Sequence, residues 1–345
     1  MTEFLNGLGA PVLIGALVLC ALVIGWAGTK MTGLADTIAD RTGLGEAITG
    51  GVLLGAATSL SGTVVSITAA LNGDASLAFS NAIGGIAAQT VFLAVADLLY
   101  RRANLEHAGA EPEHMLQAAF LILLLSLPLF ALGAPEAAIF AIHPVSVVLV
   151  GVYVVSVVTT ARVKEDPSWV VVTTSETRED TPEDDEEAGR SVWPLVPFSV
   201  ALLVLLGLTG WVLAIVAGQL IQRFGLSSSF VGAAMTATIT SLPELVTTVA
   251  AVRRGALQLA IGGIIGGNTF DVLFLTVSDA AYRDGSIYAA IGPADLFWLA
   301  TGLVMTAILL TGLLVRQKTG PGKIGGESVA LFAVYLAALG IQAWA

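Results

Sequence analysis

Long apolar stretches recur from one end of the chain to the other. A helix of about 20 apolar residues can cross the hydrocarbon core of a bilayer, which is about 30 Å thick. The pattern predicts an all-α integral membrane protein with ten transmembrane helices. The expected spans are 10–28, 44–72, 75–99, 115–133, 136–160, 194–222, 228–252, 256–282, 290–315 and 325–344.

The composition supports this class. Hydrophobic residues make up 56% of the 345 residues and charged residues only 12%, about half of the share in soluble domains. The sequence contains no phosphate-binding loop, nucleophile elbow or His/Cys metal motif, so we expect no enzyme activity, cofactor or nucleic-acid partner. The expected partners are membrane lipid and small cations, with no protein partner. The single cysteine, Cys20, excludes an intramolecular disulfide.

Much of the net charge of −11 lies in one segment. Residues 163–192 are rich in acids and poor in apolar residues, so they cannot form a core and are predicted to be a disordered linker. A solvated linker is the simpler interpretation, and a segment that gathers cations is the alternative. The linker separates a first half, 1–162, from a second half, 193–345. Its acids are Glu165, Asp166, Glu176, Glu179, Asp180, Glu183, Asp184, Asp185, Glu186 and Glu187.

The basic residues predict the orientation, because short cytoplasmic loops are enriched in Lys and Arg. With the N-terminus outside, 13 of the 15 basic residues fall on the inner side, and only Arg223 and Arg283 fall outside. We therefore expect both termini outside and the acidic linker in the cytoplasm, in a prokaryotic plasma membrane. The inner residues are Lys30, Arg41, Arg101, Arg102, Arg162, Lys164, Arg178, Arg190, Arg253, Arg254, Arg316, Lys318 and Lys323.

The two halves match each other without a gap when residue 58 is aligned with residue 240. Between 58–100 and 240–282, 16 of 43 positions are identical. Apolar composition alone gives about a quarter of that number, so the match is a duplication. The identical pairs include Thr58-Ser59-Leu60 with Thr240-Ser241-Leu242, Gly73 with Gly255, Ile83-Gly84-Gly85 with Ile265-Gly266-Gly267, and Asp97 with Asp279.

Each half has five expected spans, so the second half crosses the membrane in the opposite direction to the first. Inverted repeats are a transporter architecture in which interrupted helices meet at the midplane and access alternates. Both repeats, about 44–100 and about 227–282, carry a polar stretch in the middle of their first span, and the second contains Pro243. Proline removes a backbone donor and hydroxyls satisfy the freed groups, so we predict broken helices there.

The second repeat reads Thr240-Ser241-Leu242-Pro243-Glu244-Leu245-Val246 and later Gly266-Gly267-Asn268-Thr269-Phe270-Asp271. It resembles the α-repeats of the cation/Ca²⁺ antiporter superfamily, which includes the Na⁺/Ca²⁺ exchangers and whose repeats read like GTSLPEL…GN..GSN.FN. The first repeat departs from this pattern. Gly62 stands in place of the family's glutamate, and Gln89 in place of its Asn or Asp.

The resemblance implies a cation site with one glutamate missing. Its implied ligands are Glu244 and Asp271, the hydroxyls of Thr58, Ser59, Thr240 and Ser241, the side chains of Gln89 and Asn268, and the backbone carbonyls of Gly55 and Ala237. A carboxylate inside a membrane is a functional candidate by default. The four hydroxyls could instead satisfy the helix breaks, and Gln89 and Asn268 could bridge helices.

Asp97 and Asp279 recur at matching positions about 12 Å along the helix from Gln89 and Asp271. They are expected near opposite membrane interfaces, as a gate, a helix-end anchor or an interfacial hydrogen bond.

The leading hypothesis is secondary-active Na⁺/Ca²⁺ exchange by alternating access. Two carboxylates are neutralised by one Ca²⁺, two Na⁺ or two protons, which favours about two monovalent ions per Ca²⁺ or proton coupling. The alternatives are a proton-coupled or monovalent cation exchanger of the same fold, and a homologue that binds cations without transporting them.

Overall fold

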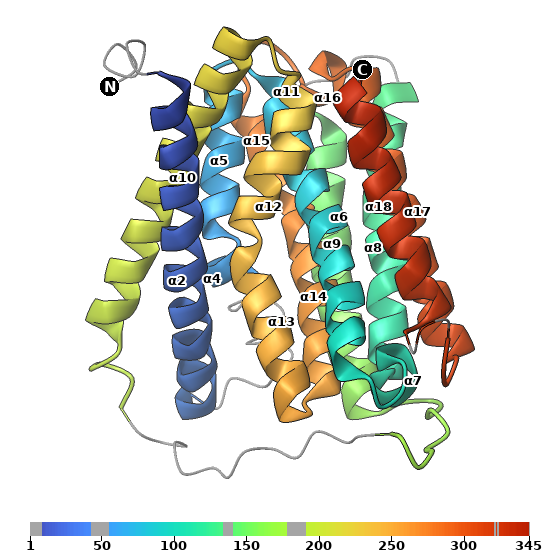
Figure 1. Ribbon diagram of the computed structural model, residues 1–345. Coiled ribbons are helices and arrows are strands. Elements are labelled where there is room, and N and C mark those ends of the chain that lie inside the picture. The colour runs from blue at the N-terminus through green and yellow to red at the C-terminus, as the bar shows by residue number, and fades with distance from the viewer. Residues whose placement is uncertain are drawn as a thin grey trace.

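The computed structural model describes residues 9–42, 55–133, 141–177, 191–320, 322 and 324–344. All regular structure within these residues is helical (Figure 1). The main helices are α2 (Ala10–Thr42), α4 (Gly55–Thr58), α5 (Leu60–Leu71), α6 (Ala75–Tyr100), α7 (Leu105–Gly109), α8 (Pro112–Gly133), α9 (Pro144–Glu165), α10 (Val196–Phe224), α11 (Ser228–Phe230), η2 (Val231–Thr236), α12 (Ala237–Thr240), α13 (Leu242–Arg254), α14 (Leu257–Asp271), α15 (Leu273–Ala281), α16 (Ile287–Ala290), α17 (Pro293–Val315) and α18 (Gly326–Trp344).

Eight described helices are long and apolar enough to cross a membrane. A ninth candidate is the pair Ser228–Thr240 and Leu242–Arg254, which is bent by 47° at the break. The expected span 44–72 corresponds to α4 and α5, and its first part, 44–54, lies outside the described residues. The all-helical prediction is thus confirmed, whereas the described residues do not establish the count of ten.

The first span is longer than the sequence pattern predicts. The apolar run ends near residue 28, yet α2 continues to Thr42. The hydroxyls of Thr29, Thr32 and Thr37 donate to carbonyls four residues earlier, and no proline interrupts the helix. The hydroxyl groups of these threonines are thereby satisfied within the helix itself.

The alignment of the two repeats also relates the helix ends. The break between α4 and α5 lies at Ser59, and the break between α12 and α13 lies at Ser241. Gly73 and Gly255 follow these broken segments with φ of +80° and +90°, a backbone conformation that glycine adopts without steric cost. The duplication seen in the sequence is therefore a duplication of backbone structure.

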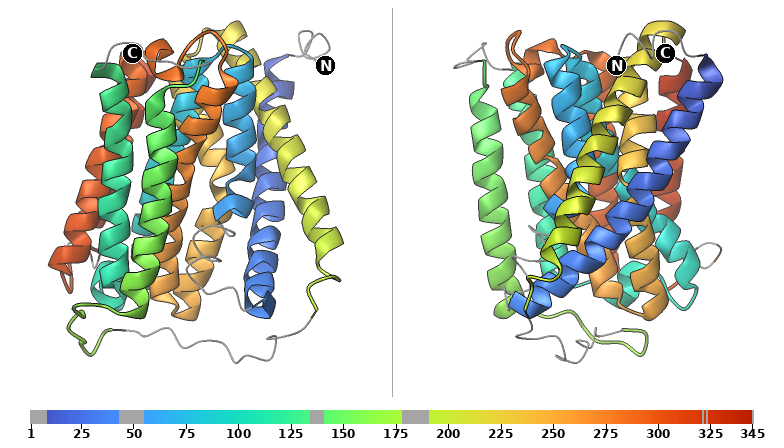
Figure 2. Two further views of the ribbon diagram at one scale, coloured as in Figure 1. Left: turned by 180° about the vertical axis from the view of Figure 1, so that it is seen from behind. Right: turned by 90° about the vertical axis from the view of Figure 1, so that its left-hand side faces the viewer.

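The two halves run in opposite directions. In Figure 1, α2 descends from the upper end of the bundle and its counterpart α10 ascends from the lower end. The start of α2 and the end of α18 lie at the same upper end, and residues 166–177 lie at the lower end (Figure 2). The helix ends that carry the described basic residues of the predicted inner side, such as those of α6, α9 and α13, also point to the lower end.

The helix α6 forms the centre of the bundle. Nearly all of its residues from Ala75 to Asp97 are buried, and many are Ala or Gly, which allow neighbouring helices to approach closely. On one side, α2 and α10 pack against the two helix breaks. A Cβ on Gly28 would collide with the Pro243 ring, and one on Gly210 would lie 2.5 Å from the Ser61 carbonyl oxygen. Only glycine fits at these two equivalent positions.

Asp97 holds several chain segments together at the lower end. Its carboxylate accepts hydrogen bonds from the backbone N–H groups of Leu105 and Gly325 (both 2.7 Å) and from the Ser328 hydroxyl (2.9 Å).

Asp279 does the same at the upper end. It accepts hydrogen bonds from Ile287 N–H (2.9 Å), His143 N–H (2.7 Å), and the hydroxyls of Ser146 (2.7 Å) and Ser286 (3.1 Å). Ile287, His143 and Ser146 are the counterparts, in the same ungapped alignment, of the three donors to Asp97. Both aspartates therefore have the geometry of helix-end anchors.

Part of the predicted linker lies against the helices. Its residues 178–190 are outside the described part of the chain, and residues 166–177 contain no helix. The segment 171–177, which we call the strap, contacts the lower end of the bundle. Arg316 donates to the Val172 carbonyl (2.9 Å), and Lys318 pairs with Glu176 (2.7 Å).

We predict that Asp279→Asn destabilises the protein. Asparagine replaces one of the two carboxylate oxygens with an NH₂ group, which donates hydrogen bonds and does not accept them. The donors that this oxygen served are left unpaired, and each buried unpaired donor costs roughly 1–3 kcal/mol. The thermal unfolding midpoint in detergent should fall for Asp279→Asn and remain unchanged for Asp284→Asn, because Asp284 is exposed at the same end. Equal midpoints for the two variants would contradict the anchoring role.

Candidate functional site

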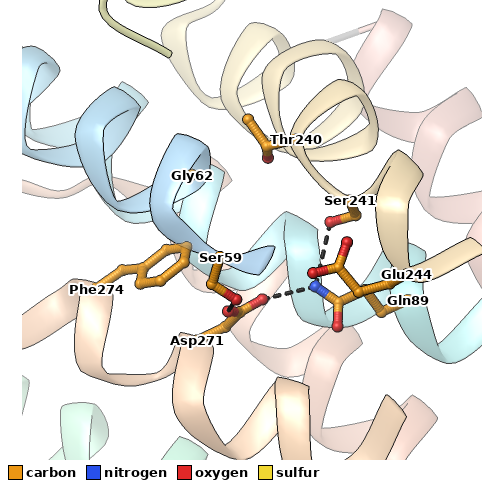
Figure 3. A pocket seen from close by; sticks show the side chains of 8 residues that line it. All are labelled: Ser59, Gly62, Gln89, Thr240, Ser241, Glu244, Asp271 and Phe274. Carbon is orange, nitrogen blue, oxygen red and sulfur yellow. Dashed lines mark hydrogen bonds between the residues drawn. The ribbon is translucent and has the colours of Figure 1, made fainter. Parts of the chain in front are cut away.

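A small cavity lies where the two helix breaks meet the middle of α6 and the junction of α14 and α15 (Figure 3). Its volume is about 10 Å³, enough for a single water-sized occupant. The residues that line it are Ser59, Gly62, Gln89, Thr240, Ser241, Glu244, Asp271 and Phe274.

A chain of hydrogen bonds joins the two repeats across the cavity. Ser59 donates to Asp271 (2.5 Å), and the Gln89 amide donates to the other oxygen of Asp271 (2.6 Å) and to Ser241 (3.2 Å). Gln89 and Asp271 are equivalent positions of the two repeats, as are Ser59 and Ser241. A direct contact between equivalent residues places Gln89 and Asp271 close to the axis that relates the two halves.

Glu244 faces the same cavity from the first turn of α13. A new helix starts after the break at Ser241. Pro243 fits the first turn of this helix, because backbone N–H groups in a first turn have no carbonyl partner within the helix and the missing N–H of proline costs nothing there. A carboxylate in the first turn is stabilised by the helix dipole. The side chain is 7% exposed, and its Oε2 atom has no hydrogen-bond partner among the described residues. The Thr58 hydroxyl approaches this carboxylate from the other repeat.

The position of the missing glutamate is filled by an aromatic ring. A Cβ on Gly62 would lie 2.8 Å from Cε2 of Phe274 and 3.4 Å from the Thr240 hydroxyl. Figure 3 shows the Phe274 ring beside the start of α5, next to Ser59. The cavity therefore has carboxylates at Glu244 and Asp271 and an apolar wall on the side of Gly62.

The other expected ligands lie near the cavity but do not line it. The carbonyls of Gly55 and Ala237 accept hydrogen bonds from the Thr58 and Thr240 hydroxyls (3.3 and 3.1 Å) and from the backbone N–H groups at each break. The two threonine hydroxyls thus provide hydrogen bonds to backbone carbonyls at the helix breaks. Asn268 is fully buried and donates to Thr90 (3.0 Å), which bridges α14 and α6.

Two features of the site were not expected from the sequence. The first is Phe274, although its counterpart Phe92 is one of the identical pairs of the repeat. The second is Asn81, which donates to the Gly62 carbonyl (3.1 Å) and accepts a hydrogen bond from Thr236 (2.6 Å). A lone asparagine in an apolar helix is the only sequence signal for this link between the two broken segments.

The cavity is lined by acidic and neutral oxygen-bearing side chains. Two buried carboxylates face it together with hydroxyl oxygens and the Oε1 atom of Gln89, which also lacks a hydrogen-bond partner among the described residues. None of the residues that line it is basic. Buried charges require compensation by a cation or by protons.

We predict that Gly62→Glu alone disrupts the site, because the new side chain collides with the Phe274 ring and overpacking of this kind costs about 1–3 kcal/mol. The double variant Gly62→Glu/Phe274→Ala should recover part of the lost stability, because the ring has been removed. The measurement is the unfolding midpoint of both variants and of Phe274→Ala. A single variant as stable as the parent would show that the ring does not occupy this space.

Comparisons with known proteins agree with the residues and the fold. The chain is 31% identical to the inner membrane protein YrbG of Escherichia coli over 121 residues, and 32% identical to the sodium/calcium exchanger MaX1 of Methanosarcina acetivorans over 118 residues. These matches cover 35% and 34% of this chain, and the chain spans only 36% and 32% of the two relatives.

A solved structure shares the fold over nearly the whole chain. The H⁺/Ca²⁺ exchanger CAX superposes with a TM-score of 0.65 at 14% identity, covering 99% of this chain and 87% of that one. The model of the family described as sodium/calcium exchanger protein matches residues 12–162 and 193–344, which leaves out the whole acidic linker, 163–192. The chain therefore belongs to the sodium/calcium exchanger family.

Proposed function

We propose that this protein is a secondary-active antiporter that exchanges Ca²⁺ for monovalent cations, with Glu244 and Asp271 as its charged ligands. The observation that carries the proposal is the cavity in which these two buried carboxylates face each other across the helix breaks. Ser59, Thr240, Ser241 and Gln89 would supply neutral oxygens. Further neutral ligands would become available when the cavity changes shape during transport. These are Thr58, Asn268 and the carbonyls of Gly55 and Ala237.

The architecture supports alternating access. The halves 1–162 and 193–345, joined by the linker 163–192, would form ten spans of which the described helices account for most. Two halves in opposite orientation can exchange conformations, which opens the shared site to each side in turn. The gathering of basic helix ends at the linker end supports a cytoplasmic location for that end and an outer location for both termini.

The charge of the cavity limits the stoichiometry. Two carboxylates are neutralised by one Ca²⁺, two Na⁺ or two protons, and a further cation would leave net positive charge in a poorly solvated site. Phe274 lies where a third carboxylate would otherwise project. We therefore infer an exchange of about two monovalent ions per Ca²⁺.

Two coupling ions are compatible with this balance. MaX1 is named a sodium/calcium exchanger and CAX an H⁺/Ca²⁺ exchanger. Na⁺ coupling is our primary proposal. Proton coupling is the second candidate, favoured by the loss of one carboxylate from the family pattern. The remaining alternatives are an exchanger of monovalent cations only and a cation-binding protein that does not transport.

We predict that Ca²⁺ uptake into Na⁺-loaded proteoliposomes is lost in Glu244→Gln and Asp271→Asn. Each change removes one of the two charges that offset the cation, and a loss of at least about tenfold is expected if each charge contributes more than about 1.4 kcal/mol. Glu165→Gln, at the exposed end of α9, is the matched control and should retain uptake. Full uptake by Glu244→Gln would refute the site assignment.

We also predict near-electroneutral exchange. Uptake of Ca²⁺ should depend little on an imposed membrane potential, because two monovalent ions carry the same charge as one Ca²⁺. Replacing the Na⁺ gradient with a proton gradient separates the two coupling ions. Uptake that rises steeply with inside-positive potential would indicate three or more monovalent ions leaving per Ca²⁺ and contradict the inferred balance.

A further inference from the structure

The lower end of the bundle holds a buried acid that the transport cavity does not use. Glu106 lies on the short helix α7, in the connection between α6 and α8, and its side chain is nevertheless 1% exposed. Neither of its carboxylate oxygens has a hydrogen-bond donor among the described residues. A buried carboxylate without donors is strongly unfavourable unless it gains a proton or a counter-charge.

A second acid faces it. Glu327, in the first turn of α18, lies within hydrogen-bond reach of Glu106, and its Oε1 atom also lacks a donor. The aliphatic part of the Glu327 side chain packs tightly on α17 at Gly312. A Cβ added to Gly312 would lie only 2.5 Å from the Glu327 Cγ atom. Glu327 therefore has little room to turn away. Asp97, the anchor of this end, adds a third nearby negative charge.

The other half of the protein provides an internal comparison. In the ungapped alignment of the two halves, the counterparts of Glu106 and Glu327 are Tyr288 and Val145. The Tyr288 hydroxyl lies 3.0 Å from that of Ser146, next to the second anchor, Asp279. The same anchor is thus built there without additional acids, so the acid pair is not a requirement of the fold.

The nearby cations are engaged elsewhere. Arg316, at the end of α17, donates to the carbonyls of Val172 and His107, and His107 contacts the Arg316 carbonyl (2.7 Å). Lys318 pairs with Glu176 of the strap. Within the described part of the chain, no Lys, Arg or His forms an ion pair with Glu106 or Glu327. No group of three acidic, His or Cys residues in that part is arranged to hold a metal ion.

We propose that Glu106 and Glu327 share one proton, forming a proton-binding site at the linker end of the bundle, distinct from the cation cavity. The proton turns one carboxyl group into the donor that the other lacks, and it removes one negative charge from beside Asp97. Burial, together with the charges of Asp97 and Glu327, raises the pKa of Glu106 well above its usual value. Glu106 lies on α7, whose His107 contacts Thr174 of the strap (3.2 Å).

Infrared spectroscopy tests the shared proton directly through the C=O stretch of a protonated carboxyl group. The background is the full chain carrying Glu244→Gln and Asp271→Asn, so that the result does not depend on the transport site. At neutral pH, the protonated-carboxyl signal of this background should lose one component in Glu106→Gln. It should lose the same component in Glu327→Gln, because either new amide donates to the remaining carboxylate.

Glu176→Gln is the matched control. A hydrogen bond from Lys318 lowers the pKa of Glu176 to about 2, so this acid is ionised at neutral pH and its replacement should leave the signal unchanged. A signal that survives both Glu106→Gln and Glu327→Gln overturns the proposal, as does a background spectrum without any protonated carboxyl group.

The pH dependence of stability is a second readout. Because the pKa of Glu106 is higher in the folded than in the unfolded chain, its contribution is complete below the unfolded pKa and is lost as the pH rises through the folded pKa. As the pH rises above the ordinary pKa of a glutamate, the unfolding midpoint of the background should therefore fall more steeply than that of Glu106→Gln, which cannot ionise. Parallel pH profiles would contradict the shared proton.

Discussion

Two carboxylates share a cavity inside an apolar bundle, and none of the residues that line this cavity is basic. Glu244 and Asp271 are 7% and 2% exposed, and their charges must be offset by something that enters the cavity. The helix breaks make this arrangement possible. They end one helix and start another at mid-bundle, which places hydroxyls and a helix N-terminus beside the carboxylates without leaving backbone groups unsatisfied.

The duplication has been retained unevenly. The helix breaks, the tight glycine contacts and the aspartate anchors all have counterparts in the other half, because a buried group that loses one partner costs stability. In the cavity, by contrast, Ser59 and Ser241 are retained but two other equivalent pairs carry different groups. Glu244 faces it in one half, whereas Gly62 leaves room for the Phe274 ring in the other. Asp271 contacts its own counterpart, Gln89, which donates a hydrogen bond instead of adding a third negative charge. The fold is kept while the number of ionisable groups changes.

The amino-acid pattern alone predicts the class and most helix boundaries, and the family resemblance names most of the residues that line the cavity. Apolar run lengths and the ungapped repeat depend on local composition and spacing, which is why the expected span 75–99 corresponds to α6 (Ala75–Tyr100). The pattern also identifies the acids and hydroxyls that the structure brings together, with the family resemblance supplying their roles. It does not predict that α2 extends to Thr42, because the apolar run that predicts this span ends near residue 28.

Tertiary packing decides which of the candidate residues meet in the cavity. Ser59, Gln89 and Asp271 meet because helices distant in the chain cross at the repeat axis, a geometry that spacing along one chain does not encode. The same holds for Phe274 beside Gly62 and for the pairing of two acids at the linker end. Whether a gap left by glycine is filled by an aromatic ring or by a charge depends on the packing of separate helices, and packing is a property of the assembled bundle.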